Sequence, residues 1–563
     1  MSLDRTMRVT PPYLLAPTIQ ARSQRRRRLA SVLLALTLLA AVAADARLCG
    51  SRQVERYRAS QGLEPPAARV ALAPRTEHIA VGTRLEFDVF NRSSMMAATC
   101  RHVGKRAYVF VEDSMWDENG GPILGHHAAA LASQFEVSTP ADAGRGIYQL
   151  GAATFGEPFD ADGDPRIFIV VLDTGVGNIL GFFDRAVSSH ADPDLRRDAL
   201  FLDADEVWLR QTRAAGTLAH EFQHLIHWGF DTDEEVWINE GLSGYAEELA
   251  GYPEIDTSMV PAYLQNPSVD LTGWSNQAYN YGSTYLFTSY LAERYGKELI
   301  GDLVAEPRNG QFGIDDALQA GGIDRDFKQV WGDWIAATYA AAGEAGYTAT
   351  RGRRPAVSTP PDVPFENWLS VVAAQWGGSH LMLLPKGPLR LEFNGQPPGK
   401  FTVWVHSVGA GGSQLEPLSL IDEEDGEIRI AAVDTVVVSV GRSSAQGGFF
   451  TLSAETVEIP TAVAPPPPTG LGKAFDLRVF PNPFNSQVRI QFELGSASPV
   501  EVVVYDVLGQ RVRRLTRADW SAGIHQVFWD GRAENGTAVA SGIYKVVLQA
   551  LHVRFSRSIS LVR

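Results

Sequence analysis

Cysteine is nearly absent from this sequence. Only Cys49 and Cys100 occur among 563 residues, which excludes a small scaffold held together by many disulfides. If the chain is exported, these two cysteines could form one disulfide bond.

An excess of positive charge is also missing. The 50 Lys and Arg residues are outnumbered by 65 Asp and Glu, which gives a formal net charge of −15. This balance argues against nucleic-acid binding and fits a protein that is soluble outside the cell. With 45% hydrophobic and 20% charged residues the composition is that of ordinary globular proteins, and the length predicts several domains.

The apolar run near the N-terminus is too short for an ordinary membrane-spanning helix. Residues 29–44 are uncharged and rich in Leu and Ala, and they follow the basic stretch Arg25–Arg28. Ala44-Asp45-Ala46 then offers small residues at which a signal peptidase would cut. We therefore predict a signal peptide at residues 1–46 and a secreted or cell-surface protein. An uncleaved membrane anchor is the alternative.

The motif that carries chemistry is His220-Glu221-x-x-His224, inside an uncharged run that favours a helix. Residues four apart share one face of an α-helix, so the two imidazoles can bind one zinc ion. Glu221 can then take a proton from a water that the metal activates. No other Asp, Glu, Lys or Arg lies between Ala214 and Gly229, which predicts a largely buried helix. A solvated helix with two unrelated histidines is the alternative.

A third metal ligand is predicted sixteen residues beyond His224. Residues 235–248 read EVWINEGLSGYAEE, with apolar residues at helical spacing. A hydrolytic zinc takes three protein ligands and keeps one position open, so we predict that Glu240 is the third, with Asn239 in the surrounding shell. His227 is only three residues past His224, and we expect it beside the site rather than on the metal. Nothing in the sequence supports a cysteine that plugs the metal in a latent form.

The stretches HEFQH and WINEGLSGYAEE together resemble the gluzincin zinc peptidases. Their sequence most resembles the hyicolysin-type family of secreted bacterial metallopeptidases, and the second stretch also resembles the aminopeptidase N superfamily. The resemblance implies one zinc ion per chain, bound by His220, His224 and Glu240, with Glu221 as the general base. The spacing between His224 and Glu240 is shorter than in many gluzincins.

Two further departures from the gluzincin pattern affect the assignment. The thermolysin-like Asp four residues past the ligand Glu is replaced by Gly244, so we predict that Glu247, one turn further along, orients a zinc-binding His. The G-x-M-E-N element with which the aminopeptidase N group binds a free amino terminus does not occur. Its absence favours an endopeptidase.

A tyrosine-rich segment opens a helix that is predicted to run to about Tyr295. Amide hydrolysis places negative charge on the carbonyl oxygen, which a phenol can stabilise. Tyr279-Asn280-Tyr281-Gly282 resembles the Y-x-K-G motif of the aminopeptidase superfamily, with Tyr281 in place of Lys. The resemblance assigns this role to Tyr279 or, failing it, Tyr281. Aromatic packing around the helix start is the alternative.

An acidic loop precedes a predicted strand at residues 166–172. Asp160, Asp162 and Asp164 alternate with small residues, a pattern that suits calcium. The downstream bidentate Glu of an EF-hand is missing, so an acidic turn is the preferred interpretation and a calcium site the alternative.

The patterning along the chain predicts a series of segments. Residues 47–80 read as a spacer or short prosegment. Strands and helices follow each other in residues 81–350, as a zincin-type catalytic domain with a mixed sheet and active-site helices requires. Short β-runs with Gly-rich turns predict an accessory β-sandwich at residues 366–459, and the Pro-rich residues 460–474 predict a stiff linker.

The C-terminal residues 475–563 are again β-patterned. PNPFN, VYDVLG, WDG and SGIY recur at strand–turn spacing. Together they resemble the Ig-like C-terminal sorting domain of type IX secretion substrates, which is akin to the Ig-like part of flagellar hook-capping proteins. The resemblance implies the outer-membrane secretion and sorting machinery as a partner, followed by release or surface attachment. An additional β-sandwich that binds carbohydrate or matrix is the alternative.

The predicted fold class is therefore multidomain α+β, with a zincin-type catalytic domain followed by two β-sandwich domains. The predicted function is that of a secreted zinc metalloendopeptidase acting on protein or peptide substrates, with the oligomeric state left open. The alternatives are an aminopeptidase, or a surface adhesin whose zincin domain is only structural. A missing ligand or base would favour the adhesin, and the sequence contains all four residues.

Overall fold

The computed structural model describes residues 49–62, 78–252, 255–340, 348, 350–360, 362–372, 374–445, 448–457, 477–480, 484–494, 497–506, 510–550 and 553–562. The predicted signal peptide and the predicted Pro-rich linker lie outside these residues. In the described part of the chain, no helix is both long and apolar enough to cross a membrane.

The chain forms two compact units. The first contains the described residues up to 153 together with 157–229 and 246–259, and the second contains 154–156, 230–245 and the described residues from 260 onward. Helix α8 (Val236–Leu249) is continuous across one of these boundaries. Its first ten residues belong to the second unit and its last four to the first.

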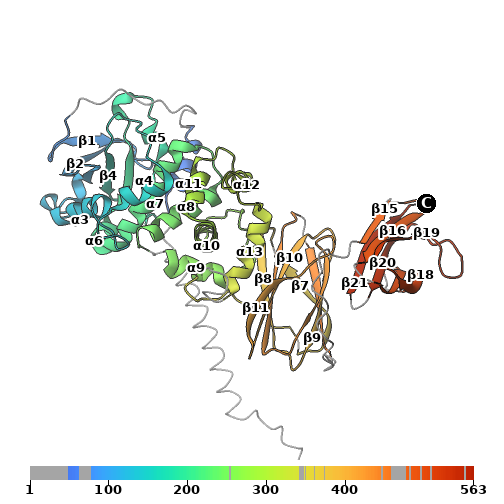
Figure 1. Ribbon diagram of the computed structural model, residues 1–563. Helices are drawn as coiled ribbons and strands as arrows, with labels where there is room; N and C mark the ends of the chain where they lie inside the picture. The colour runs from blue at the N-terminus through green and yellow to red at the C-terminus, as the bar shows by residue number, and fades with distance from the viewer. Residues whose placement is uncertain are drawn as a thin grey trace, which may run out of the picture. The chain divides into compact units, whose positions relative to one another are not determined.

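A six-stranded mixed sheet forms the centre of the first unit (Figure 1). Its order is β1-β2-β3-β4-β6-β5, in which β3, β4 and β6 are parallel neighbours and the other pairs are antiparallel. The strands are β1 (Arg84–Phe87), β2 (Met96–Val103), β3 (Ala107–Glu112), β4 (Ile167–Leu172), β5 (Gly181–Phe183) and β6 (Ala199–Asp203). The short strand β5 is therefore an edge strand, and it lies next to the candidate site described below.

The composition of the central strands explains why they lie inside. β3 and β4 read AYVFVE and IFIVVL, and every residue in them is buried, as expected for parallel strands covered on both faces. Alternate side chains such as Tyr108, Phe110, Phe168 and Val170 belong to one hydrophobic cluster. The residues between them point to the opposite face.

Helices surround this sheet in the first unit. They are α2 (Ser51–Ser60), α3 (Gly125–Glu136), α4 (Ile147–Phe155), α5 (Arg185–Ser188), α6 (Ala204–Leu209) and α7 (Gln211–Phe230), with 3-10 turns at Asp113–Met115, Asp117–Asn119 and Pro193–Leu195. Phe222 of α7 packs against Phe135 of α3 and Tyr148 of α4, with ring centroids 5.1 and 5.4 Å apart. These aromatic contacts fix α7, which carries the candidate site.

The second unit begins with helices and continues with strands. After α9 (Ile255–Gln265), its helices are α10 (Ala278–Tyr295), α11 (Lys297–Ala305), α12 (Gln311–Ala320) and α13 (Phe327–Tyr339). Trp334 of α13 stacks on Tyr263 at 5.7 Å and meets Phe287 of α10 edge to face at 5.3 Å. Helix α10 ends at Tyr295, where the sequence predicted the end of the helix that the tyrosine-rich segment opens.

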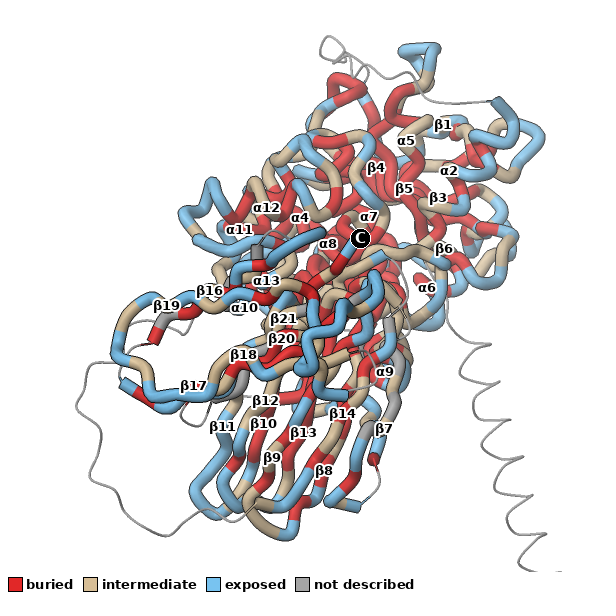
Figure 2. The backbone as a smooth tube through the Cα atoms, turned by 90° about the vertical axis from the view of Figure 1, so that its right-hand side faces the viewer, coloured by how far each residue is buried: buried red, intermediate tan, exposed pale blue. Residues whose placement is uncertain are grey.

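Two four-stranded antiparallel sheets follow the helices, in the orders β11-β10-β13-β8 and β12-β9-β14-β7. Their strands are β7 (Phe365–Val372), β8 (Gly377–Leu383), β9 (Leu389–Gly395), β10 (Phe401–Gly409), β11 (Gly412–Pro417), β12 (Asp425–Ile430), β13 (Thr435–Arg442) and β14 (Gly448–Thr456). Both sheets contribute side chains to one hydrophobic core, for example Phe393 from β9 and Val438 from β13. Figure 2 shows buried segments alternating with intermediate and exposed ones along these strands, as in β9.

The C-terminal strands form a further pair of sheets, in the orders β15-β16-β19 and β18-β17-β20-β21. They are β15 (Leu477–Phe480), β16 (Val488–Leu494), β17 (Ser498–Tyr505), β18 (Arg511–Trp520), β19 (Gly523–Trp529), β20 (Gly542–Ala550) and β21 (Val553–Leu561). Trp529 is fully buried in the core that these sheets share with Phe484 and Tyr544. Several sheets together with separate helical regions confirm the predicted multidomain α+β class.

A packed helix stands where the sequence indicated a spacer or short prosegment. Within residues 47–80, α2 buries Val54 and Arg58 against the first unit. Arg58 donates to Asp184 Oδ2 from Nε (3.1 Å) and Nη2 (2.8 Å), and to Asp88 Oδ2 from Nη1 (2.8 Å). Burial raises the pKa of the Asp184 carboxyl, and the Arg58 guanidinium opposes that rise. The sequence does not indicate that Arg58 anchors the helix, because an arginine is ordinarily expected at an exposed position.

We expect Arg58→Ala to destabilise the first unit by roughly 3–5 kcal/mol, because it leaves the buried Asp184 carboxylate without its cation. The loss should appear as a lower unfolding temperature in differential scanning calorimetry. Arg56→Ala, at an exposed position of the same helix, should change stability by no more than about 0.5 kcal/mol. Equal effects of the two substitutions would show that Arg58 does not anchor α2.

Candidate metal centre

The candidate site is built on α7. All fifteen residues from Ala214 to Trp228 are buried in this helix, as the lack of other charged residues predicted. His220 and His224 lie one turn apart with ring centroids separated by 4.9 Å, and their side chains are 4% and 5% exposed. Two imidazoles on one buried helix face need polar partners, because burial without them is costly.

Helix α8 supplies two carboxylates on one of its faces. Glu240 and Glu247 are seven residues apart, close to two helical turns. Glu247 Oε1 lies 2.9 Å from His220 Nδ1, which is where the sequence analysis expected it. A carboxylate at Nδ1 favours the tautomer that carries its proton there, so a metal ion would be bound through His220 Nε2.

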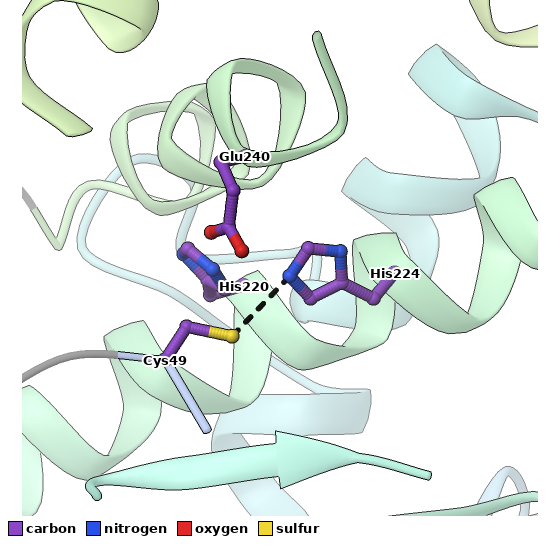
Figure 3. Close-up of side chains that lie close together, drawn as sticks. All are labelled: Cys49, His220, His224 and Glu240. Carbon is purple, nitrogen blue, oxygen red and sulfur yellow. Dashed lines mark hydrogen bonds between the residues drawn. The ribbon is translucent and has the colours of Figure 1, made fainter. Parts of the chain in front are cut away.

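Four donor atoms converge at this point. One atom each from Cys49, His220, His224 and Glu240 lies within 4.8 Å of the other three (Figure 3). His220, His224 and Glu240 are buried, and Cys49 is half-buried. Imidazole nitrogen, thiolate sulfur and carboxylate oxygen are the ligands that zinc takes in proteins, whereas calcium and magnesium prefer oxygen alone. The residues therefore fit a zinc ion.

Cys49 belongs to this group, although nothing in the sequence supported a cysteine at the metal. Its Sγ lies 3.4 Å from His224 Nε2 and 3.7 Å from Glu221 Oε2. A separation of 175 residues from His224 leaves no local spacing that could have indicated the contact. No disulfide bond joins Cys49 to Cys100, which is buried in β2, so the structure does not contain the pairing that the sequence allowed.

Glu221 is fully buried beside the donor group. Its Oε2 accepts hydrogen bonds from Ser51 Oγ at 2.8 Å and from the backbone N–H of Phe183, in the edge strand β5, at 2.9 Å. Its Oε1 has no hydrogen-bond partner among the described residues. One oxygen thus holds the carboxylate in place while the other remains available to accept a proton.

Two other predicted neighbours of the metal lie on the same helices. Asn239 is a half-buried residue directly before Glu240 in α8. His227 is fully buried, and its donor atom groups with those of Asp231 and Glu234 rather than with the zinc-type donors. Burial raises the pKa of Glu234 to about 7.

The two predicted phenols lie at the start of α10. Tyr279 Oη is 3.1 Å from Ser275 Oγ. The Tyr281 hydroxyl donates to Asn276 Oδ1 at 2.9 Å, and its buried ring packs edge to face on Trp274 at 4.8 Å. For Tyr281 this is the aromatic packing that the sequence left open as the alternative.

Of the three aspartates predicted as a possible calcium site, two lie together in the structure, and a different aspartate joins them. Asp160 and Asp162 group with Asp198, which directly precedes β6, and not with Asp164. Asp164 instead accepts hydrogen bonds from the Tyr108 hydroxyl at 2.7 Å and from the Arg166 guanidinium at 2.8 Å. The positive charge of Arg166 thereby pairs with the negative charge of Asp164. Asp198 was missed because it lies 36 residues beyond Asp162 and no loop pattern connects the two.

Comparison with known proteins gives two sequence matches. Residues 482–552 match the family model of the FlgD Ig-like domain, which agrees with the Ig-like character expected of the C-terminal segment. The neutral metalloprotease ShpI of Staphylococcus hyicus is 22% identical over 256 residues, or 40% of this chain and 55% of that protein. The chain therefore spans about half the length of this curated relative.

Similarity to solved structures is weak. Dimeric latent PorU from Porphyromonas gingivalis is 12% identical with a TM-score of 0.16, over 38% of this chain and 22% of that one. A β-glucuronidase from Ruminococcus gnavus is 12% identical with a TM-score of 0.15, over 33% and 36% of the two chains. TM-scores this low do not support a shared fold. The distant metalloprotease match and the Ig-like segment are the similarities that bear on this chain.

Glu247→Gln should weaken zinc binding by about 10- to 100-fold, because it removes the charge that orients His220. Competition with a chromophoric chelator measures this affinity directly. Glu248→Gln is the matched control, since the next position points about 100° away around the helix. Zinc binding that is equally weak in both variants would contradict the orienting role of Glu247.

Proposed function

We propose that this chain is a secreted zinc metalloendopeptidase of gluzincin type, most similar to the hyicolysin family. One observation carries the proposal. Glu221 presents a buried oxygen without a hydrogen-bond partner among the described residues, beside the donor atoms of His220, His224 and Glu240. Two imidazoles and a carboxylate as zinc ligands, with a second carboxylate as base, are the parts that metal-assisted peptide hydrolysis requires.

Each residue then has a defined task. Zinc, when bound, would polarise the scissile carbonyl and supply a nucleophile near neutral pH. Glu221 Oε1 takes the proton of the attacking water and transfers it to the leaving amine, while Oε2 stays fixed by the backbone N–H of Phe183. Glu247 keeps His220 Nε2 directed at the metal. Negative charge that develops on the carbonyl oxygen needs a donor, and the half-exposed Tyr279 suits this task better than the buried Tyr281.

The remaining segments support export and placement. We propose a zincin-type domain at residues 81–350, followed by β-sandwich domains at residues 366–459 and 475–563. The shared cores of the two pairs of sheets and the FlgD Ig-like match at residues 482–552 support the sandwiches. By its sequence resemblance the last domain would engage the type IX secretion and sorting machinery after a signal peptide at residues 1–46.

Two alternatives make different demands on the site. An adhesin with a structural zincin domain has no need of a buried base, yet Glu221 lies beside the donor group. An aminopeptidase needs a group that binds the free amino terminus of its substrate, and the sequence has no G-x-M-E-N element. Cleavage of N-terminally blocked peptides distinguishes the endopeptidase from the aminopeptidase.

The Glu221→Gln substitution should abolish cleavage of casein or gelatin, with activity reduced at least about 100-fold, because it removes the proton acceptor. Zinc content near one per chain should persist, since Glu221 is not a ligand. Cys49 lies against His224 and could affect the assay. The chain with Glu221 and the Glu221→Gln variant are therefore compared twice, once with Cys49 present and once with the additional Cys49→Ala substitution. Retained zinc with full activity in Glu221→Gln would remove Glu221 as the base. A chain that binds no zinc would favour the adhesin.

We also propose calcium for the group of Asp160, Asp162 and Asp198. One oxygen of each carboxylate accepts a backbone N–H: Asp160 from Gly163, Asp162 from Asp164 and Asp198 from Ala161. Burial and the charges of Asp162 and Asp160 raise the pKa of Asp198 well above its ordinary value. A cation among these oxygens would relieve that repulsion, and an all-oxygen set suits calcium.

Millimolar calcium should therefore raise the unfolding temperature of the full chain, because a ligand that binds only the folded state stabilises that state. At a calcium concentration of 100 times Kd, the free energy of unfolding rises by about 2.7 kcal/mol. Differential scanning fluorimetry with and without calcium measures the shift. Asp198→Asn should abolish it, and Asp117→Asn, at an exposed acidic position, should retain it. The same shift in both variants would place any bound calcium elsewhere.

A further inference from the structure

The segment Cys49–Ser51 lies along the edge strand β5 (Gly181–Phe183). The backbone N–H of Gly50 donates to Gly181 O at 2.9 Å, and Ser51 Oγ accepts from Phe183 N at 2.8 Å. A Cβ on Gly50 would come within 2.6 Å of Ile179 Cγ2, so this approach requires glycine. Extended peptides bind to exposed sheet edges through such main-chain contacts. The chain thus places its own segment on the edge that is nearest to Glu221.

The side chain of Cys49 points into the donor group. Figure 3 shows its sulfur directed at the ring of His224, where the Sγ–Nε2 distance is 3.4 Å. Its sulfur also belongs to the set of four donor atoms that lie within 4.8 Å of one another. Two histidines, a glutamate and a cysteine make four ligands, which is the number that closed, structural zinc sites have.

Ser51 acts on the second functional group of the site. Its hydroxyl donates to Glu221 Oε2 at 2.8 Å and accepts from the Phe183 N–H that also contacts this oxygen. This hydrogen bond places Ser51 directly against the carboxylate that the proposed function makes the base. Two residues of one short segment therefore contact a metal ligand and the predicted base.

Helix α2 keeps this segment in place. Val54 is 1% exposed in the hydrophobic cluster of the first unit, and Arg58 pairs with Asp184 and Asp88. Because the helix begins at Ser51, these anchors limit the movement of Cys49. A segment held only by its own side chains at the site would leave it far more easily.

We propose that Cys49–Ser51 is a built-in latch that keeps the metal centre inactive, with Cys49 as the fourth zinc ligand. This inference rests on the proposed peptidase function and adds its regulation. On closing, the Cys49 thiol loses its proton to solvent and its sulfur takes the place of water on the metal. On opening, water returns and the sulfur leaves, which restores the open position that hydrolysis needs.

The test uses the zinc-loaded full chain and X-ray absorption at the zinc edge, which reports ligands whether or not the protein is active. The wild-type spectrum should contain one sulfur at about 2.3 Å. Cys49→Ala should lose this sulfur and keep the zinc. Cys100→Ala is the matched control, because it removes the other thiol, which lies buried in β2, and it should retain the sulfur signal.

Peptidase activity gives the second readout. Cys49→Ala should be about tenfold more active than the wild-type chain, as expected if the latch keeps roughly nine molecules in ten closed. Bound zinc without a sulfur ligand in the wild-type chain would overturn the latch and leave the proposed function intact. Loss of the sulfur without a gain in activity would overturn latency. Absence of bound zinc would instead overturn the proposed function itself.

Discussion

The site depends on the contact between His220 Nδ1 and Glu247 Oε1. A buried imidazole needs a partner for its N–H, and this carboxylate provides it while leaving Nε2 for a metal. The same contact sets the rotation of α8, because Glu240 lies seven residues before Glu247 and so shares its face. One hydrogen bond thereby orients the His220 ring and places Glu240 on the same side of the site. The positions of Glu221 and His224 follow from the periodicity of α7.

The edge of the sheet is the second constraint on the site. An edge strand exposes unpaired N–H and C=O groups that attract another chain, and proteins commonly cover such edges. Here the cover is the segment Cys49–Ser51, which hydrogen-bonds to Gly181 and Phe183. If the proposed peptidase binds its substrate as a strand on this edge, the substrate would meet the same surface that Cys49–Ser51 occupies. Competition between substrate and latch for one strand edge would couple activity to the position of α2.

Local patterns in the sequence predicted most of the residues that meet at the candidate site. The spacing of His220 and His224, and the lack of other charge around them, predicted a buried helix with both imidazoles on one face. The period of residues 235–248 put Glu240 and Glu247 on one side of a second helix, and the structure places Glu247 against His220. The continuous apolar run in residues 166–172 likewise predicted β4. These inferences succeeded because helix and strand periodicity depend only on neighbouring residues.

Contacts between distant parts of the chain were decided by tertiary structure alone. The approach of Cys49 to His224, the pairing of Arg58 with Asp184 and the position of Asp198 beside Asp162 join residues that no repeat connects. The hydrogen bond of Tyr281 to Asn276 depends in the same way on how α10 begins. Such contacts arise from the packing of whole elements, in which a side chain is placed by the helix or strand that carries it. The sequence therefore determined which groups the site contains, and the packing decided which of them meet.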